Sequence, residues 1–161
     1  TPADIERAAA ALMQEYGTDR CLIVLDYLQK MASVTMTETG DGALRKKVGN
    51  LASDLRQVGT NLGVPVLSIC ATNREGQKAS NGSQKGTDVP AFKMQDFKES
   101  GEIEYACDSA YGLVAPADGD GDPSRTVNLY RPKNRQGATI KSDPLKVAFN
   151  WRTGRQTEIT R

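Results

Sequence analysis

Asp26 is the residue whose position in the sequence most directly suggests chemistry. It follows the apolar run 21–25 with no polar residue in between. An apolar run without alternation is typical of a strand buried on both faces, as in parallel sheets covered by helices. Ligands of such sheets bind beyond the carboxyl ends of the strands, where nucleotide-hydrolysing folds keep an acid that holds Mg²⁺ through water. The alternative is an aspartate that simply ends a core strand, and these residues alone leave both readings open.

Lys133 and Arg135 are a second candidate group. They lie two residues apart at the end of a predicted strand, 126–130, and just before Gln136 and Gly137. Side chains two apart on an extended chain point to the same side, so both cations could reach one phosphate group. The forked donors of arginine suit a phosphoryl group better than lysine alone. Cations in a turn are more commonly just exposed to solvent, and the local sequence does not choose between these roles.

The residue types that are missing exclude whole classes of site. The 161 residues include no histidine, which rules out histidine-based triads, general bases and metal ligands. The 3 cysteines, Cys21, Cys70 and Cys107, are widely spaced and odd in number. They predict small core thiols in a reducing compartment, and neither a disulfide framework nor a zinc site.

Length and composition predict a single globular domain over residues 1–161. Apolar residues make up 38% of the chain and charged residues 25%, which is ordinary for a soluble protein. No apolar run approaches the ~20 residues needed to cross a bilayer, so we expect no membrane partner. The formal net charge of +1 argues against a protein that coats nucleic acid, but it leaves room for a local basic channel.

Two amphipathic helices are well marked. The first begins with Thr1 as N-cap and Pro2 in its first turn, and it ends at Gly17. In the second, apolar residues recur at helical spacing and Gly63 provides the stop. This stripe consists of Leu44, Val48, Leu51, Leu55, Val58 and Leu62.

The remaining pattern predicts an α/β fold. Helix and strand alternate early in the chain and strands follow one another later, which predicts a mostly parallel sheet whose later strands pair antiparallel. We expect strands at 21–28, 64–70, 109–115, 126–130, 145–151 and 156–159, loops at 32–42 and from 73 to about 90, and a short irregular helix between 96 and 107.

Four blocks of sequence add more specific information. They are 25–31 (LDYLQKM), 62–67 (LGVPVL) with 72–74 (TNR), 98–108 (KESGEIEYACD) and 133–137 (KNRQG). In this order they resemble the Walker B segment, the next strand and its exit, the DNA-binding loop and the arginine-finger turn of the DnaB-type replicative helicases. These helicases are a branch of the RecA-like P-loop ATPases. The resemblance spans nearly the whole chain, from residue 1 to about 157.

The resemblance implies roles in a nucleotide site shared between subunits. Asp26 would be the catalytic acid that holds Mg²⁺ through water next to ATP. Lys133 and Arg135 would act in trans, on the ATP bound by a neighbouring subunit. The family carries a γ-phosphate-sensing glutamine where this chain has Ala71. Thr72 or Asn73 could substitute for it, and we include Asn73 as nucleotide-binding.

The resemblance also implies a site for single-stranded DNA. Lys98, Glu99 and Gly101 match family positions that approach the DNA backbone, and Arg74 adds charge upstream. Lys98 would supply positive charge, and Gly101 would allow a backbone amide to come close to a phosphate. Glu99 cannot neutralise a phosphate, so we expect it to orient a neighbouring group.

The sequence departs from the family in one further respect. It contains no Gly-x-x-x-x-Gly-Lys-Ser/Thr loop, the element that cradles nucleotide phosphates. In the family this loop lies upstream, and Thr1 is not a methionine. We therefore expect a fragment of a RecA-like core that lacks the phosphate-loop strand and is inactive by itself.

The function implied for the whole protein is that of an ATP-dependent DNA helicase. It would use ATP and Mg²⁺, assemble as a hexameric ring on single-stranded DNA, and work in the cytoplasm at the nucleoid, with a primase or a helicase loader as further candidate partners. Two alternatives stay open. One is a degenerate RecA-like module that binds DNA or a partner without hydrolysis, and the other is a RecA-like ATPase of the recombinase or clock type.

Overall fold

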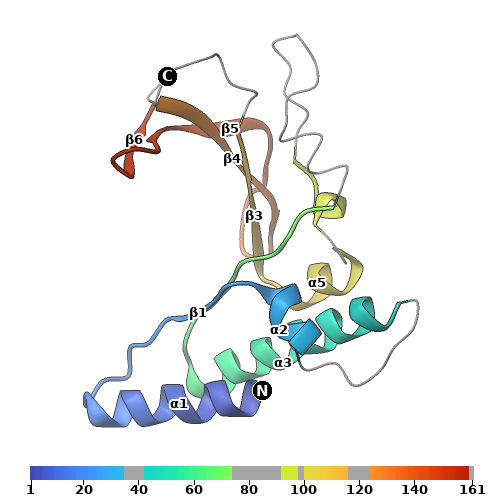
Figure 1. The fold of residues 1–161 in the computed structure, drawn as a ribbon, viewed down its shortest axis with the longest axis vertical. Helices are drawn as coiled ribbons and strands as arrows, with labels where there is room; N and C mark the ends of the chain where they lie inside the picture. The colour runs from blue at the N-terminus through green and yellow to red at the C-terminus, as the bar shows by residue number, and fades with distance from the viewer. Residues whose placement is uncertain (35–41, 74–91, 98–99, 116–123, 160–161) are drawn as a thin grey trace. The chain divides into compact units, whose positions relative to one another are not determined.

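The structure is a computed structural model of the chain, and it describes residues 1–34, 42–73, 92–97, 100–115 and 124–159. The chain divides into two compact units (Figure 1). The first unit consists of Thr1–Ala71 and Lys98–Cys107, and the second of Thr72–Phe97 and Asp108–Arg161. The expectation of one domain over 1–161 stays a prediction.

Both predicted helices are confirmed in the first unit. Helix α1 (Pro2–Glu15) begins with a capping box, in which Thr1 Oγ1 accepts a hydrogen bond from the Asp4 backbone N–H and the Asp4 carboxylate accepts from the Thr1 amino group. Helix α3 (Ala43–Leu62) ends where Gly63 takes a left-handed conformation at φ +67°. A residue with a Cβ would be strained at this φ, which is why the helix stops at a glycine.

The core of the first unit lies along the apolar stripe of α3. Two further helices pack on it: α2 (Leu28–Val34) and α5 (Ser100–Ala106). Gly49 of α3 allows the close approach of α5, because a Cβ at this position would overlap the side chain of Glu102. The buried residues of this core are Leu28, Ala32, Val48, Leu51, Leu55 and Ile103.

Strands β1 (Ile23–Leu25) and β2 (Val66–Ser68) form a parallel pair, with Val24 opposite Leu67. One face of the pair packs on the core through Leu25 and Val66. The other face is not buried, since Val24 and Leu67 are 56% and 51% exposed. The prediction that residues 21–28 form a strand buried on both faces is therefore wrong. The apolar run correctly identified a strand, but the described helices of this unit cover only one of its sides.

The predicted strand 21–28 and loop 32–42 also have different limits in the structure. The strand ends at Leu25, and helix α2 begins at Leu28 and continues to Val34. This helix was missed because seven residues are too few to establish a helical period next to an apolar strand. The rest of that loop, residues 35–41, and most of the predicted loop 73–90 lie outside the described residues.

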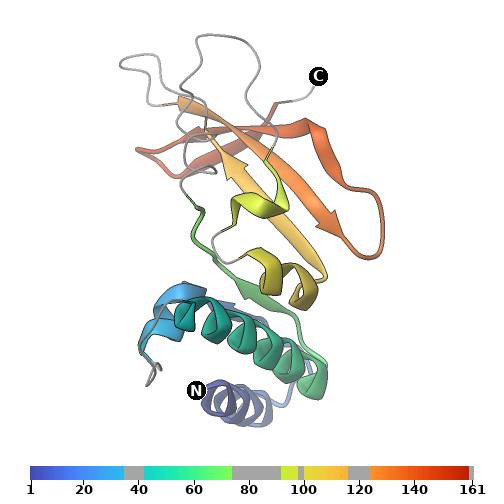
Figure 2. The same ribbon diagram turned by 90° about the vertical axis from the view of Figure 1, so that its right-hand side faces the viewer.

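The second unit contains an antiparallel sheet of four strands in the order β3-β4-β5-β6 (Figure 2). The strands are β3 (Ser109–Val114), β4 (Ser124–Asn134), β5 (Ile140–Asn150) and β6 (Arg155–Glu158). Gly112 of β3 lies against the ring of Phe92, where a Cβ would overlap the ring. Phe92 packs edge-on against Phe97, with 5.1 Å between ring centroids. Between these two residues lies the short 3-10 helix η1 (Met94–Asp96).

The predicted antiparallel pairing of the later strands is confirmed. Parallel pairing among the described strands is confined to β1 and β2, so the predicted mostly parallel sheet is found only in part. Strands β4 and β5 are longer than the predicted strands 126–130 and 145–151. Strand β4 continues through Pro132 to Asn134, and β5 begins at Ile140 and includes Pro144. Within the part of the chain that the structure describes, no helix has the length and apolar character needed to span a membrane.

Candidate functional site

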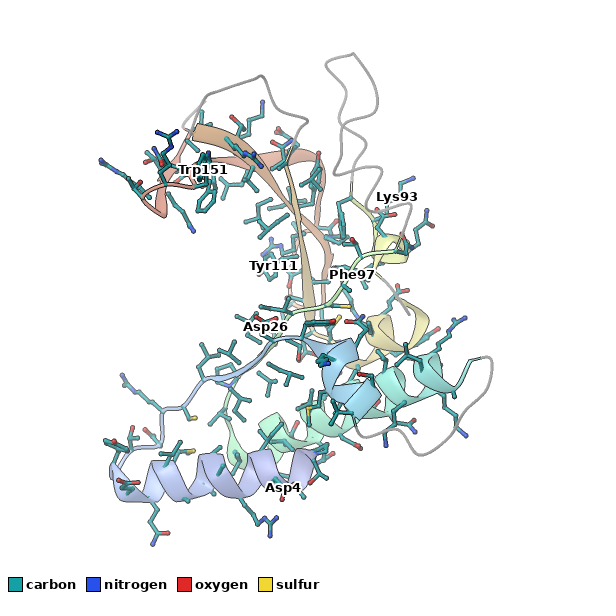
Figure 3. The ribbon with its side chains drawn as sticks, in the orientation of Figure 1. Asp4, Asp26, Lys93, Phe97, Tyr111 and Trp151 are labelled. Atoms are coloured by element: carbon teal, nitrogen blue, oxygen red, sulfur yellow. The ribbon has the colours of Figure 1, made fainter. Side chains whose placement is uncertain are left out.

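Asp26 lies directly after β1 and is exposed, at the carboxyl end of the parallel pair (Figure 3). Hydrogen bonds to Ile69 hold the chain on both sides of it. The Ile69 N–H donates to the Leu25 carbonyl over 2.9 Å, and the Leu28 N–H donates to the Ile69 carbonyl over 2.9 Å. The peptide bond between Asp26 and Tyr27 is cis. The carboxylate thus has the location predicted for it, although its role remains a prediction.

A magnesium ion fits Asp26 only with help from other groups. The described residues contain no group of three or more His, Cys, Asp or Glu side chains that could hold a metal. Mg²⁺ in nucleotide sites typically keeps several waters and takes one or two carboxylates together with the substrate's phosphates. One exposed carboxylate at a strand end is compatible with that pattern, because water and ATP would supply the remaining oxygens.

Gln29 is a feature of this region that the sequence reasoning missed. It lies in the first turn of α2, three positions after Asp26, and is 6% exposed. Its Oε1 accepts a hydrogen bond from the Ala71 N–H over 3.0 Å, and its Nε2 donates to Cys70 Sγ over 2.9 Å. A polar side chain between the apolar residues Leu28 and Met31 was the available signal. It was treated only as part of a family motif.

Asn73, predicted to bind nucleotide, is engaged with η1 in the second unit. Its backbone N–H donates to the Asp96 carbonyl over 2.8 Å, and its side-chain amide donates to the Gln95 carbonyl. Asp96 in turn is buried and accepts a hydrogen bond from the Lys93 N–H over 2.6 Å. The Gln95 carbonyl thus engages one of the two N–H donors of the Asn73 side-chain amide.

Lys133 and Arg135 lie at the end of β4 and in the turn that follows. Lys133 is paired with Ala110 of β3, so the strand reaches further than predicted and includes this lysine. The Arg135 guanidinium forms an ion pair with Asp108, with 3.1 Å between Nη1 and Oδ1. The Arg135 N–H also donates to the Asp108 carbonyl over 2.8 Å.

The ion pair of Arg135 is exposed to solvent. The two side chains are 43% and 58% exposed, with Arg135 the less exposed of the two. Exposed ion pairs typically contribute about 0–1 kcal/mol. Breaking the ion pair with Asp108 therefore costs little, and a phosphate group could compete for the Arg135 guanidinium. Asp26 belongs to the first unit, and Lys133 and Arg135 belong to the second.

Of the residues predicted to bind DNA, the structure describes only Gly101, and Arg74, Lys98 and Glu99 lie outside the described residues. Gly101 is in the first turn of α5, where a Cβ would lie 2.9 Å from Nη2 of Arg45. The missing side chain therefore makes room for a guanidinium group. Arg45 lies in the first turn of α3. It is exposed, but it also brings positive charge to the position predicted for DNA.

Comparison with known proteins places these residues in a family. Residues 1–156 match the DnaB-like helicase C terminal domain. A search of curated proteins finds no match. Among solved structures, a DnaB-like replicative helicase whose interactions with primase are described superposes with a TM-score of 0.74 at 17% identity, covering 99% of this chain.

At such an identity this likeness carries no more than the fold. Together with the family match, it supports the predicted RecA-like α/β fold. The chain spans 35% of the length of that helicase chain. The family match is broader evidence, since it extends over all the described helices and through strand β5. The chain therefore belongs to the DnaB-like helicase C-terminal domain family.

Proposed function

We propose that this chain forms part of the ATP-hydrolysing motor of a replicative DNA helicase. The observation that carries the proposal is the exposed Asp26 at the carboxyl end of a parallel strand pair, in a chain of this family. The motor would couple ATP hydrolysis at subunit interfaces of a hexameric ring to translocation on single-stranded DNA. The two compact units would belong to one ATPase domain, in the cytoplasm at the nucleoid, with primase or a loader as partners.

Asp26 would hold Mg²⁺ through water, and the ion would neutralise charge on the phosphates of ATP. The exposure of the carboxylate and the two hydrogen bonds that fix its neighbours to Ile69 support this role. The 161 residues contain no phosphate-binding loop of the Gly-Lys-Ser/Thr type. The proposal therefore requires that loop to come from another part of the complete protein.

Lys133 and Arg135 would bind the transferred phosphate of ATP in the neighbouring subunit. Arginine fingers of this kind are worth about 10³–10⁵ in rate in other phosphoryl-transfer enzymes. The exposed, exchangeable ion pair between Arg135 and Asp108 supports this role, because the guanidinium can leave one carboxylate for a more highly charged phosphate.

Single-stranded DNA would bind at the start of α5. The guanidinium of Arg45, which lies beside Gly101 where a Cβ would otherwise be, supports this assignment. Lys98, Glu99 and Arg74 remain predicted contacts. Arg45 joins them, since a cation next to a side-chain-free backbone is suited to the phosphates of a strand and not to its bases.

Asp26→Asn in the complete protein is the direct test of the motor. We expect DNA-stimulated ATPase turnover to fall at least 100-fold, because the neutral amide binds a hydrated cation much more weakly than the carboxylate. Asp19→Asn is a matched control, since Asp19 is exposed in the segment between α1 and β1. Equal turnover of the Asp26 variant and the wild type would show that this acid has no part in hydrolysis.

A second candidate is a degenerate module that binds DNA without hydrolysis. Ala71 favours it, since its methyl group cannot form the hydrogen bond of a γ-phosphate sensor and its backbone N–H is already bonded to Gln29. Fluorescence anisotropy with labelled single-stranded DNA separates the two functions. Tight binding that is independent of nucleotide, together with no ATPase activity in the wild-type complete protein, would support the module.

A further inference from the structure

Gln29 is a buried polar side chain that has no role in the function proposed above. Glutamine is mostly found at protein surfaces, and a buried amide is tolerated where its hydrogen bonds are satisfied. Gln29 is 6% exposed, and both ends of its amide have partners. Both partners lie on one short segment, Cys70 and Ala71, which is 41 and 42 positions away in the sequence.

These bonds continue the pairing of β1 and β2 beyond the strands themselves. The ladder ends with Leu25 opposite Ser68. Ile69 then bonds to Leu25 on one side and to Leu28 on the other. Gln29 extends the series to Cys70 and Ala71 through its side chain. The chain from Leu25 to Gln29 is thus bonded to the exit of β2 at Leu25, Leu28 and Gln29, and Asp26 lies inside this segment.

Ala71 takes part in this arrangement through its backbone. Its side chain is a methyl group, so the backbone is the only polar part of the residue that can hold it in place. The Ala71 N–H donates to Gln29, and the Ala71 carbonyl accepts from the Cys70 thiol over 3.4 Å. Without Gln29, the N–H at the exit of β2 would lose this partner, while the bond between the Leu28 N–H and the Ile69 carbonyl would remain.

We propose that Gln29 is a positioning residue that locks the exit of β2 at Ala71 to the segment carrying Asp26. Gln29 would not touch the nucleotide or the metal. It would fix the position of the Asp26 carboxylate relative to the carboxyl ends of β1 and β2. A hydrated cation would then bind the carboxylate in a single geometry. Its effect on ATP turnover rests on the proposed role of Asp26. Its effect on the Ala71 N–H does not.

Two variants of the complete protein test the proposal. Gln29→Met has about the same length, no donor, and only a weakly accepting thioether sulfur in place of the amide. Gln29→Glu keeps an oxygen that can accept from the Ala71 N–H and loses the donor to Cys70. Gln57→Met is the matched control, because Gln57 is exposed on α3 and its side chain bonds only to the neighbouring Asn61 within the contacts described.

The first measurement is hydrogen exchange, followed on peptides that contain Ala71. We expect Gln29→Met to speed exchange there at least tenfold and to leave peptides from the middle of α3 unchanged. Gln29→Glu should stay within threefold of the wild type, since it keeps the acceptor. Unchanged exchange at Ala71 in Gln29→Met would overturn the lock, whatever happens to ATP hydrolysis.

The second measurement is ATP turnover as a function of ATP and Mg²⁺. We expect Gln29→Met to lower kcat at least tenfold with KM for ATP within threefold, and to raise the Mg²⁺ concentration for half-maximal rate at least fivefold. A residue that only stabilised the fold would lower the amount of active enzyme and leave the Mg²⁺ dependence unchanged. Faster exchange at Ala71 with wild-type turnover and Mg²⁺ dependence would overturn the positioning role.

The failure of this proposal is distinguishable from failure of the motor proposal. If Asp26→Asn keeps wild-type turnover, the motor assignment is wrong, and the exchange measurement still decides whether Gln29 holds Ala71. If Asp26→Asn is inactive and Gln29→Met matches the wild type in both measurements, only the inference on Gln29 is wrong. Should Gln29→Met not fold, Gln29→Glu carries the test, since loss of the Cys70 bond alone should then leave exchange at Ala71 slow.

Discussion

Arg135, which we propose as a finger residue, forms an exposed ion pair. Its partner Asp108 holds the guanidinium at the end of β4, and the backbone bond between the same two residues fixes the turn. Because the pair is exposed, releasing the side chain costs about 0–1 kcal/mol. The turn itself would stay in place, since the backbone bond does not depend on the side chain.

Replacing Arg135 by alanine tests the finger role. In the complete protein, we expect ATPase turnover to fall about 10³-fold or more, the lower end seen for such fingers, with the dissociation constant for ATP within threefold. The reason is that a finger acts on the transferred phosphate and contributes little to binding of the ground state. Turnover is measured at saturating ATP, with the exposed Arg152→Ala as control. Turnover equal to that of the control would remove the assignment.

Ionisation of the single residue Tyr130 makes the stability of the fold depend on pH. It is 3% exposed on β4, and burial raises the pKa of its hydroxyl above the ordinary value of 10.0. The folded state thus binds this proton more tightly than the unfolded state does. The stabilisation is complete below pH 10.0, and it is lost as the pH rises from there through the folded-state pKa.

We therefore expect the wild type to lose stability above pH 10 more steeply than Tyr130→Phe, which has no hydroxyl to ionise. Between pH 7 and 9 the difference in free energy of unfolding between the two proteins should be constant. Urea unfolding followed by circular dichroism at several pH values measures both. Parallel curves for the two proteins up to pH 11 would mean that Tyr130 ionises equally easily in both states.

At the scale of elements, two glycines are required because another segment packs closely against each of them. Gly49 lets α5 approach α3, and Gly112 lets the ring of Phe92 lie on β3. Neither glycine has a positive φ, so what they provide is space and not an unusual backbone conformation. Hydrophobic periodicity gives no sign of such contacts, because they depend on segments that are distant in the sequence.

Gly112→Ala tests the packing of Phe92 on the sheet. We expect a loss of about 1–3 kcal/mol in the free energy of unfolding, typical of an added methyl group in a packed core. The loss should shrink to under about 1 kcal/mol when Phe92→Ala is already present, since the ring that the methyl would strike is gone. Chemical unfolding of the four proteins of this cycle measures the coupling. Additive losses would show that Gly112 is required by the strand and not by Phe92.

The elements also show what could be predicted from the sequence. Helices α1 and α3 were found because capping residues, an apolar stripe and a terminal glycine agree with one another, as Thr1 and Gly63 show. The strand before Asp26 was found, but its exposed face was not, because an apolar run does not say what covers it. Gln29 was missed for a related reason: its partners, Cys70 and Ala71, are set by tertiary structure alone.

At the scale of the whole molecule, charge is nearly balanced, with 21 basic and 20 acidic residues. The proposed affinity for DNA cannot then come from the overall charge, and we expect it to come from a few local cations. Arg45 beside Gly101 is such a cation among the described residues. Each phosphate contact on a single strand releases counterions, so the logarithm of affinity should fall with the logarithm of salt with a slope of about −0.7 per contact.

Arg45→Ala in the complete protein should therefore do two things together. It should weaken binding to single-stranded DNA, and it should flatten the salt dependence by about 0.7 for every Arg45 that touches a phosphate. Anisotropy titrations between low and moderate salt measure both, and Arg7→Ala on α1 is the control, because Arg7 is exposed and pairs with Asp4. Weaker binding with an unchanged slope would mean that Arg45 supports the start of α5 without reaching the strand. Binding indifferent to salt in the wild type would mean that local cations do not hold DNA in this molecule, and the DNA site proposed at α5 would have to be abandoned.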